Sequence, residues 1–401
     1  MNDLSGARVV QLHVIHDLGG GSATWLRDFV RADSARGNLV LRSFAQSAAA
    51  GSGLALYADA EGEAPIRTWT FAQPIAATVA SHPEYRAALA EVIASHGVGG
   101  LVVSSVIGHS LDVLDTGLPT VVVNHDYFPF SATINLHFDA AGRLDESDQR
   151  MPFAGYPEEE RARVRERFLE LVRQPQVAMA VPSASVAQNL RRLDARFAEV
   201  TFHTVPHGYG RPLERLRYEL GGADERLRLL VLGQLSKDKG LELLRGALPQ
   251  LRPFADVWLV GCREVGELFR YEPHVHLVSY YEIGELPAHV GHIRPHAGLL
   301  MSQVPETFSY ALSELLMLGI PPVATRLGSF AERIAHGDDG FLYEPDAAAL
   351  VQVLRELDRD RTRLERVRAR IAGWKPRSAA DMVADYHKLL PARPAWMECA
   401  R

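Results

Sequence analysis

Residues 305–334 read PETFSYALSELLMLGIPPVATRLGSFAERI and decide the fold that we expect for the chain. Four apolar residues recur there at the i, i+3, i+4 and i+7 spacing of an amphipathic helix: Phe308, Ala311, Leu312 and Leu315. Gly319, followed by two prolines, ends the predicted helix. One helix face is therefore expected to be buried, with Ser309 and Ser313 lying off it.

Two glutamates, Glu306 and Glu314, also lie off the apolar stripe. Glu306 is expected at or just before the helix start, where backbone N–H groups and the positive dipole end favour an anion. At ~1.5 Å per residue, the two carboxylates would lie about 12 Å apart along the helix axis. A diphosphate on the N–H groups of Thr307, Phe308 and Ser309 would leave one glutamate at each end. The ligand that this arrangement describes is a nucleotide sugar.

The same stretch resembles the signature of retaining glycosyltransferases of family 4. The matching residues are Pro305-Glu306-Thr307-Phe308, Glu314, Gly319-Ile320-Pro321-Pro322-Val323-Ala324, Gly328 and Glu332. The resemblance implies that Glu306 contacts the transferred sugar and that Glu314 binds the ribose. Glu314 alone would fit a solvated helix face equally well, but the Gly-Ile-Pro-Pro run and the glycine turn favour the family interpretation.

The resemblance also implies the GT-B fold, an α/β architecture of two Rossmann-like, doubly wound parallel-sheet domains that face a central cleft. With 401 residues the chain is long enough for two cores. We place an N-terminal acceptor-binding domain at 1–208, a linker at 209–226 and a donor-binding domain at 227–375. Residues 376–401 resemble the terminal helix that crosses back to the first domain, followed by a tail.

A glycine loop follows the first predicted strand, residues 9–15. The loop is Gly20-Gly21-Ser22, and a helix is expected from Ala23. Thr24 stands where the dinucleotide fingerprint G-x-G-x-x-G needs its last glycine, and the next strand ends without an acidic residue. NAD binding is therefore disfavoured, and the loop resembles the family's glycine loop at the cleft.

Two histidines follow strands of the first domain, at the carboxyl ends where ligands of a parallel sheet gather. For His109 we favour a packed side chain that bonds a backbone carbonyl over a contact with the acceptor. His125 resembles the family's histidine near the reacting carbon of the sugar. Asp126 either contacts the acceptor as well or is a turn residue before Tyr127. Asp126 and Tyr127 complete the predicted acceptor side.

Residues 130–157 contain few periodic apolar positions and predict a long loop, in which we place further acceptor contacts. The helix expected at 158–173 alternates arginine with glutamate. Such a helix favours a solvated face, with contact to anionic lipid as the alternative.

The loop 233–240, which begins at Gly233, resembles the family's donor diphosphate loop. Lys239 matches the phosphate lysine. Gln234 stands where the family more often has arginine, so one of two expected cations is missing, and a neutral amide offers a hydrogen bond without charge. Either Lys237 substitutes for that cation or the donor binds more weakly.

Gly261, at the end of a further predicted strand, is expected against the nucleobase. Tyr280 either stacks on the base or is an ordinary core or rim tyrosine. The sequence has neither zinc-ligand spacing nor a P-loop, so we expect no metal site and no cofactor besides the nucleotide-sugar co-substrate.

Composition limits the remaining classes. The formal net charge of −6 argues against nucleic acid as a partner. Only Cys262 and Cys399 occur, which is typical of a reducing cytoplasm rather than a disulfide framework. The N-terminus shows no signal-peptide pattern and no apolar run approaches the ~20 residues of a membrane span, so we expect a cytoplasmic protein.

The resemblance thus implies a retaining, metal-independent hexosyltransferase that takes mannose, rhamnose or glucose from a nucleotide sugar. The His-Asp-Tyr-Phe-Pro run at 125–129 resembles bacterial enzymes of O-antigen and other surface polysaccharides, which implies a glycan or lipid-linked acceptor and peripheral contact with the inner membrane. The alternative, motivated by Gln234, is a catalytically weak nucleotide-sugar-binding or scaffold subunit of a polysaccharide assembly complex.

Overall fold

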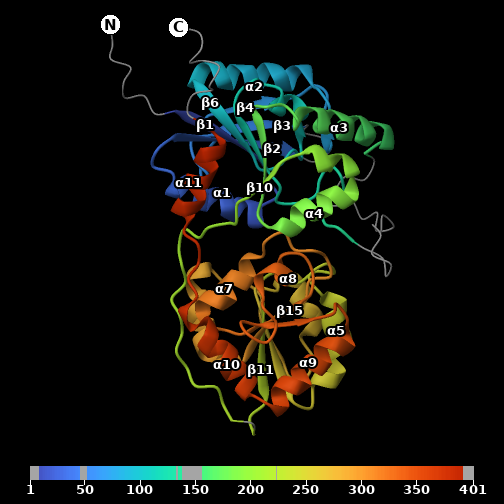
Figure 1. The fold of residues 1–401 in the computed structure, drawn as a ribbon, viewed down its shortest axis with the longest axis vertical. Coiled ribbons are helices and arrows are strands. Elements are labelled where there is room, and N and C mark those ends of the chain that lie inside the picture. Colours follow the sequence, from blue (N-terminus) through green and yellow to red (C-terminus); the bar gives the residue numbers. More distant parts are fainter. Residues whose placement is uncertain (1–8, 46–51, 132–133, 138–155, 223, 392–401) are drawn as a thin grey trace. The chain divides into compact units, whose positions relative to one another are not determined.

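The computed structural model describes residues 9–45, 52–131, 134–137, 156–222 and 224–391, and it contains two compact α/β units (Figure 1). Unit 1 is Met1–Gly210 together with Arg377–Arg401, and unit 2 is Arg211–Pro376. The segment that we predicted as a separate linker, 209–226, therefore groups almost entirely with unit 2.

Unit 1 is built on an eight-stranded sheet with the order β10-β9-β8-β6-β1-β2-β3-β4. The sheet strands are β1 (Val10–His16), β2 (Gly37–Ala45), β3 (Ser52–Tyr57), β4 (Arg67–Thr70), β6 (Val98–Val103), β8 (Thr120–Val123), β9 (Val177–Val181) and β10 (Phe202–Thr204). Two further strands, β5 (Thr78–Val79) and β7 (His109–Ser110), pair with each other. The helices are α1 (Gly21–Ala32), α2 (Pro83–His96), α3 (Glu158–Leu171), α4 (Ala184–Leu193) and α11 (Ala379–Leu389).

The unit 1 sheet is not wholly parallel, and this corrects the fully parallel pairing predicted for it, although its strand order still reverses in the middle of the sheet. Strands β2, β3 and β4 pair antiparallel along one edge, whereas the strands from β10 to β2 are parallel. A parallel crossover needs a dozen or more residues, usually with a helix. Only six residues separate Ala45 from Ser52, which is too few for such a crossover and favours antiparallel pairing of β2 with β3.

The terminal helix α11 packs on α1 of unit 1. Its Tyr386 ring lies 5.3 Å from the Trp25 ring and 5.5 Å from the Phe29 ring, all three being buried. His387 Nε2 lies 3.1 Å from an oxygen of Asp33, just beyond the end of α1. Aromatic packing and a polar contact together hold the C-terminal helix on the first unit.

Unit 2 has a six-stranded sheet, wholly parallel, with the order β13-β12-β11-β14-β15-β16. Its strands are β11 (Leu227–Leu232), β12 (Ala255–Val260), β13 (Val275–Val278), β14 (Ala297–Leu300), β15 (Pro322–Thr325) and β16 (Phe341–Tyr343). Its helices are α5 (Leu241–Leu251), α6 (Leu286–Ile293), α7 (Tyr310–Leu318), α8 (Ser329–Arg333), α9 (Ala347–Arg359) and α10 (Thr362–Arg370).

The strand order of unit 2 is that of a Rossmann sheet, 3-2-1-4-5-6 when its strands are counted along the chain. The order reverses between β11 and β14. The central strand β11 is almost entirely buried, as expected of a strand covered on both faces. Ligands of such sheets bind beyond the carboxyl ends of the strands at the reversal, so the loops after β11 and β14 are where a site is expected.

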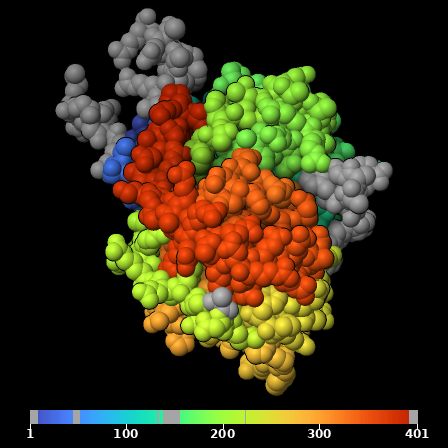
Figure 2. Space-filling view, turned by 60° about the horizontal axis from the view of Figure 1, so that its bottom comes forward, coloured from blue at the N-terminus to red at the C-terminus, as the bar shows by residue number. Residues whose placement is uncertain are grey.

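Residues 211–222 contain no helix or strand and lie along unit 2 as a strap. Four of its apolar residues pack against the unit 2 core: Leu213, Leu216, Tyr218 and Leu220. Arg215 donates to the backbone oxygen of Ile371 at 2.8 Å. Part of the yellow-green strap is visible on the surface in Figure 2. The predicted linker is therefore anchored to the second unit.

Candidate functional site

The loops after β11 and β14 contact each other at the reversal point of the unit 2 sheet. The backbone N–H of Gln303 donates to Asp238 O at 2.7 Å. Gly240 has a φ of 90°, and a Cβ on it would overlap with Met301. Gly233, at a φ of 93°, turns the chain directly after β11 with open space beside it. Glycine lets these two loops approach each other closely.

This contact joins two of the predicted site residues. The ammonium group of Lys239, from the first loop, forms an ion pair with the Glu306 carboxylate, from the second. The Lys239 side chain is 48% exposed, whereas Glu306 is only 12% exposed. The lysine predicted for phosphate and the glutamate predicted for the sugar thus lie side by side. Gln234, in the same loop as Lys239, is exposed to solvent.

The helix predicted to begin near Glu306 begins later, at Tyr310. Ser309 is its N-cap and accepts a hydrogen bond from the Leu312 N–H at 3.2 Å. The φ of Ser309 is 68°, which is incompatible with an α-helix and explains the late start. Thr307, Phe308 and Ser309 therefore belong to a loop, residues 305–309, and the 12 Å helical spacing of the two glutamates does not apply.

Glu314 lies within α7 and is half-buried, so it is not the fully solvated residue of the alternative interpretation. Burial raises the pKa of its carboxyl to about 7, and no charged or hydrogen-bonding group contributes to the shift. Its neighbour Ser313 was expected off the apolar face but is buried, because Arg333 Nη2 donates to its hydroxyl at 2.5 Å. A half-buried carboxylate of this kind is suited to accept hydrogen bonds from ligand hydroxyls.

The tyrosine beside this carboxylate is Tyr281 rather than the predicted Tyr280. Tyr280 is 62% exposed and donates its hydroxyl to Glu264. Tyr281 is half-buried, and a Cβ on Gly261 would lie 2.6 Å from its ring. Burial, with the charge of Glu314 as the second cause, raises the pKa of Tyr281. The sequence offers the two tyrosines as a doublet, and only the tertiary packing decides which one faces Gly261.

Gly20-Gly21-Ser22 forms the start of α1, and the helix begins at Gly21, two residues before the predicted start. Gly20 is exposed, has a φ of 82°, and has open space where a Cβ would lie. The hydroxyl of Ser22 donates to Gly19 O at 3.4 Å. The loop thus presents backbone to solvent at the end of β1, the central strand at which the unit 1 sheet reverses its order.

His125 follows β8 and is half-buried among aromatic rings. Its ring centroid lies 5.0 Å from that of Trp25 and 5.1 Å from that of His207. Burial, and secondarily the charge of His16, lowers the pKa of His125 to about 3. The imidazole is therefore neutral at pH 7 and acts as a hydrogen-bonding group rather than as a cation.

Three residues of the predicted acceptor side have structural partners instead. Asp126 accepts from the Phe128 N–H at 2.9 Å, which is the turn alternative, and burial raises its pKa to about 7. Tyr127 is buried, and its hydroxyl accepts from Asn189 at 3.0 Å. His109 is fully buried between Ile15 O and the Tyr85 hydroxyl, each 3.0 Å from a ring nitrogen. We therefore remove Tyr127 and His109 from the acceptor contacts.

The acceptor contacts predicted within 130–157 fall mostly at 132–133 and 138–155, outside the described residues. In α3, the arginines are paired, for example Arg163 with Glu160 at 2.6 Å and Arg167 with Asp115 at 2.6 Å. None of the helices in the described ranges has the length and apolar content needed to cross a lipid bilayer. Within those ranges, no three His, Cys, Asp or Glu side chains gather as metal ligands.

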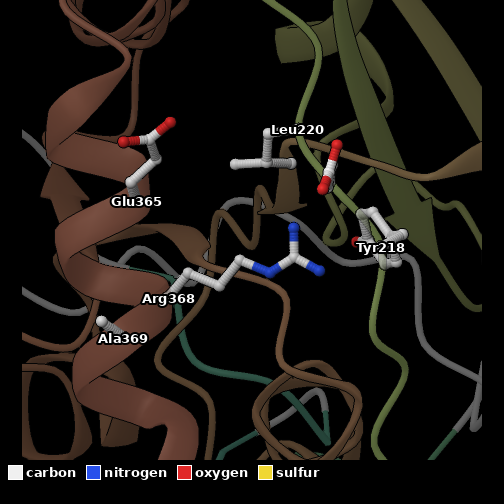
Figure 3. Close-up of a pocket in the computed structure, with 6 residues that line it drawn as sticks. Tyr218, Leu220, Glu365, Arg368 and Ala369 are labelled. Atoms are coloured by element: carbon white, nitrogen blue, oxygen red, sulfur yellow. The ribbon is translucent and has the colours of Figure 1, made fainter.

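A surface hollow of about 460 Å³ lies apart from these residues, between the strap and α10 (Figure 3). The Arg368 guanidinium lies 3.9 Å from the centre of the Tyr218 ring in its wall. None of the residues predicted for donor binding lines this hollow. We therefore place the candidate site at the loops after β11 and β14.

A family model and several solved structures show what the chain is similar to. Residues 226–360 match the family model described as Glycosyl transferases group 1. This part of the chain is therefore similar to the domain that the model describes. The matched region contains both loops of the Lys239–Glu306 pair. No curated protein gives a significant sequence match.

Solved structures extend the likeness to nearly the whole length of the chain. Sucrose-phosphate synthase from Thermosynechococcus elongatus aligns with a TM-score of 0.63 at 15% identity, over 94% of this chain and 98% of that one. HepE from Anabaena, in complex with UDP and glucose, aligns with a TM-score of 0.61 at 17% identity, over 94% of this chain and 98% of that one. The catalytic domain of starch synthase IV from Arabidopsis thaliana, bound to ADP and acarbose, aligns with a TM-score of 0.58 at 12% identity, over 96% of this chain and 99% of that one. The predicted GT-B fold is confirmed.

Proposed function

We propose that the protein is a retaining glycosyltransferase that moves a hexose from a nucleoside-diphosphate sugar to a hydroxyl of a glycan or lipid-linked acceptor. The observation that carries this proposal is the pairing of Lys239 with Glu306 at the point where the unit 2 sheet reverses its order. A cation and a carboxylate are there held together by two loops, the first of which has a glycine at each end, and such a pair is suited to bind a diphosphate and a sugar.

The kind of donor is supported by the similar structures. HepE was solved with UDP-glucose, and starch synthase IV with ADP, so the two ligands differ in base and share a ribose diphosphate. The half-buried carboxylate of Glu314, near Tyr281, is the group that we assign to the ribose hydroxyls. We assign the base to the neighbourhood of Gly261, at the end of β12, where the Tyr281 ring packs against the backbone.

The reaction that we propose breaks the bond between the anomeric carbon and the phosphate oxygen, and the bonding electrons pass to the diphosphate. The acceptor oxygen bonds to the same face of that carbon, and the acceptor proton passes to the leaving phosphate. Lys239 stabilises the negative charge that develops on the phosphate, and Glu306 stabilises the positive charge on the sugar ring. The role of His125, as a neutral hydrogen-bonding group at the sugar, stays a prediction.

We further propose that the reaction needs no metal ion, because a lysine and backbone N–H groups supply the phosphate contacts. The surface-polysaccharide context, the cytoplasmic location and peripheral contact with the inner membrane are proposals from the sequence resemblance. A bilayer-flotation assay with anionic vesicles tests the membrane contact, and it contradicts that part if the protein stays in the vesicle-free fraction.

Release of nucleoside diphosphate from a panel of UDP, GDP, ADP and dTDP sugars tests the function directly. The wild type is expected to release nucleoside diphosphate slowly without an acceptor and faster with one. The release should persist in the presence of EDTA. NMR of the product should show the same anomeric configuration as the donor. The E306A and K239A variants should lose about a hundredfold or more of this rate at unchanged melting temperature. A chain that binds a nucleotide sugar but never releases diphosphate would instead be the scaffold subunit.

A further inference from the structure

The 305–309 loop is held from one side by the start of α8. The N–H of Ser329 donates to Glu306 O at 2.8 Å, and the Ser329 hydroxyl donates to Phe308 O at 3.0 Å. Gly328 packs so closely that a Cβ on it would lie 2.5 Å from Glu306 O. The carbonyl groups of Glu306 and Phe308 therefore face α8.

Arg333, the last residue of α8, completes this contact. Its Nη1 donates to Phe308 O and, at 3.1 Å, to Ser309 O, while Nη2 donates at 2.5 Å to the buried hydroxyl of Ser313. The guanidinium carbon lies 4.1 Å from the centre of the Phe308 ring. One side chain thus fixes the carbonyls of Phe308 and Ser309 and also contacts the Phe308 ring, which requires a planar guanidinium with several N–H donors.

Fixing these carbonyls also fixes the direction of the following N–H groups. In a trans peptide the C=O of one residue and the N–H of the next point in opposite directions. Since the carbonyls of Phe308 and Ser309 point toward Arg333, the N–H groups of Ser309 and Tyr310 point away from it. Successive N–H groups on one side of a chain form a concavity suited to an anion.

The backbone of Ser309 gives an independent sign that this loop is held in place. Its φ of 68° and ψ of 99° are unusual for a residue other than glycine. Such conformations persist where the surroundings determine them, and they gather at ligand-binding positions. Here the determining contacts are the Arg333 bond to Ser309 O and the bond from Leu312 N–H to the Ser309 hydroxyl.

We infer that Arg333 is a positioning residue for the donor diphosphate. It acts through the 305–309 loop, by directing the N–H groups of Ser309 and Tyr310 toward the phosphate oxygens, and it does not itself touch the sugar. This inference rests on the proposed function. It adds α8 to the donor site, which the sequence analysis built from Glu306, Glu314 and the N–H groups of residues 307–309.

The test compares R333Q and R333K with the control R245Q, which alters an exposed arginine paired with Glu242 in α5. Binding of inorganic pyrophosphate, of the nucleoside diphosphate that the wild type binds best, and of the corresponding nucleoside is measured by calorimetry. R333Q should raise the Kd of both diphosphates about tenfold or more and leave the nucleoside unchanged. R333K keeps the charge without the fork and should lie between R333Q and the wild type, while R245Q should match the wild type.

Transfer kinetics give a second readout. In R333Q the kcat/KM for the donor should fall by about the factor found for diphosphate binding, while the KM for the acceptor changes less than about twofold. If R333Q does not fold, S313A, which removes only the anchor of Nη2, carries the test and should weaken diphosphate binding without affecting the nucleoside. Equal weakening of nucleoside and diphosphate, or wild-type diphosphate binding in R333Q or in S313A, overturns the inference. A wild type that binds no nucleoside diphosphate at all overturns the proposed function instead.

Discussion

Replacing Glu306 with glutamine is expected to strengthen binding of the nucleoside diphosphate while it slows sugar transfer. In the structure Lys239 is paired with Glu306, so the carboxylate and a diphosphate compete for one ammonium group. With side chains 48% and 12% exposed, such a pair is worth ~0.2–1 kcal/mol. Removal of the competing charge should therefore tighten diphosphate binding by about 1.4- to 5-fold.

The same substitution removes the negative charge of Glu306, which in our proposal stabilises the positive charge that develops on the sugar ring. The kcat should therefore fall by about a hundredfold or more. Calorimetric titration of E306Q with the nucleoside diphosphate measures the first effect, and diphosphate release from the nucleotide sugar measures the second. K239Q is the matched variant, since it should weaken diphosphate binding and also lower kcat. Weaker diphosphate binding by E306Q than by the wild type would refute the competition that this reasoning assumes.

Three further predictions concern the same unit. Burial raises the pKa of Glu314 to about 7 from a usual 4.5, so between these values the folded protein retains a proton that the unfolded chain releases. The free energy of unfolding therefore falls as the pH rises from about 4.5 to about 7 and then levels off. E314Q should therefore melt at a higher temperature than the wild type at pH 8, and this difference should vanish toward pH 4. A difference in melting temperature that is independent of pH would contradict the burial of a charged group. E314Q should also bind nucleoside diphosphate more weakly than the wild type. G261A should lose ~1–3 kcal/mol in denaturant unfolding, because the new Cβ lies 2.6 Å from the Tyr281 ring at a φ of 81°, whereas G284A, at an open site, should stay within about 0.5 kcal/mol. Q234R adds the cation that the 233–240 loop lacks and should tighten diphosphate binding severalfold at low salt and less at high salt; an unchanged affinity at low salt would show that this side chain points away from the phosphates.

The sequence predicted the elements whose patterns are local. The apolar run at 227–232 is β11, and the apolar run before the 301–309 loop is β14, so the two strands at the reversal point were predictable. Adjacent parallel strands with helical crossovers then implied the Rossmann-like sheet of unit 2.

The remaining details depend on contacts between distant residues, which periodicity does not report. The late start of α7 follows from the φ of Ser309, which Arg333 and the N-cap bond stabilise from outside the local pattern. Tyr281 rather than Tyr280 faces Gly261 because of tertiary packing. His109 bonds a backbone carbonyl, as the favoured interpretation predicted, but its second partner, the Tyr85 hydroxyl, is distant in sequence and could not be predicted. The antiparallel edge of unit 1 could have been predicted from the short connection between β2 and β3.

A crystal structure of the protein with the nucleoside diphosphate that raises its melting temperature most tests the central claim most directly. The account predicts a phosphate oxygen within hydrogen-bond distance of Lys239 Nζ and of the N–H groups at Ser309 and Tyr310, with the ribose hydroxyls on Glu314. A diphosphate bound away from the loops after β11 and β14, with the Lys239–Glu306 pair intact, would contradict it.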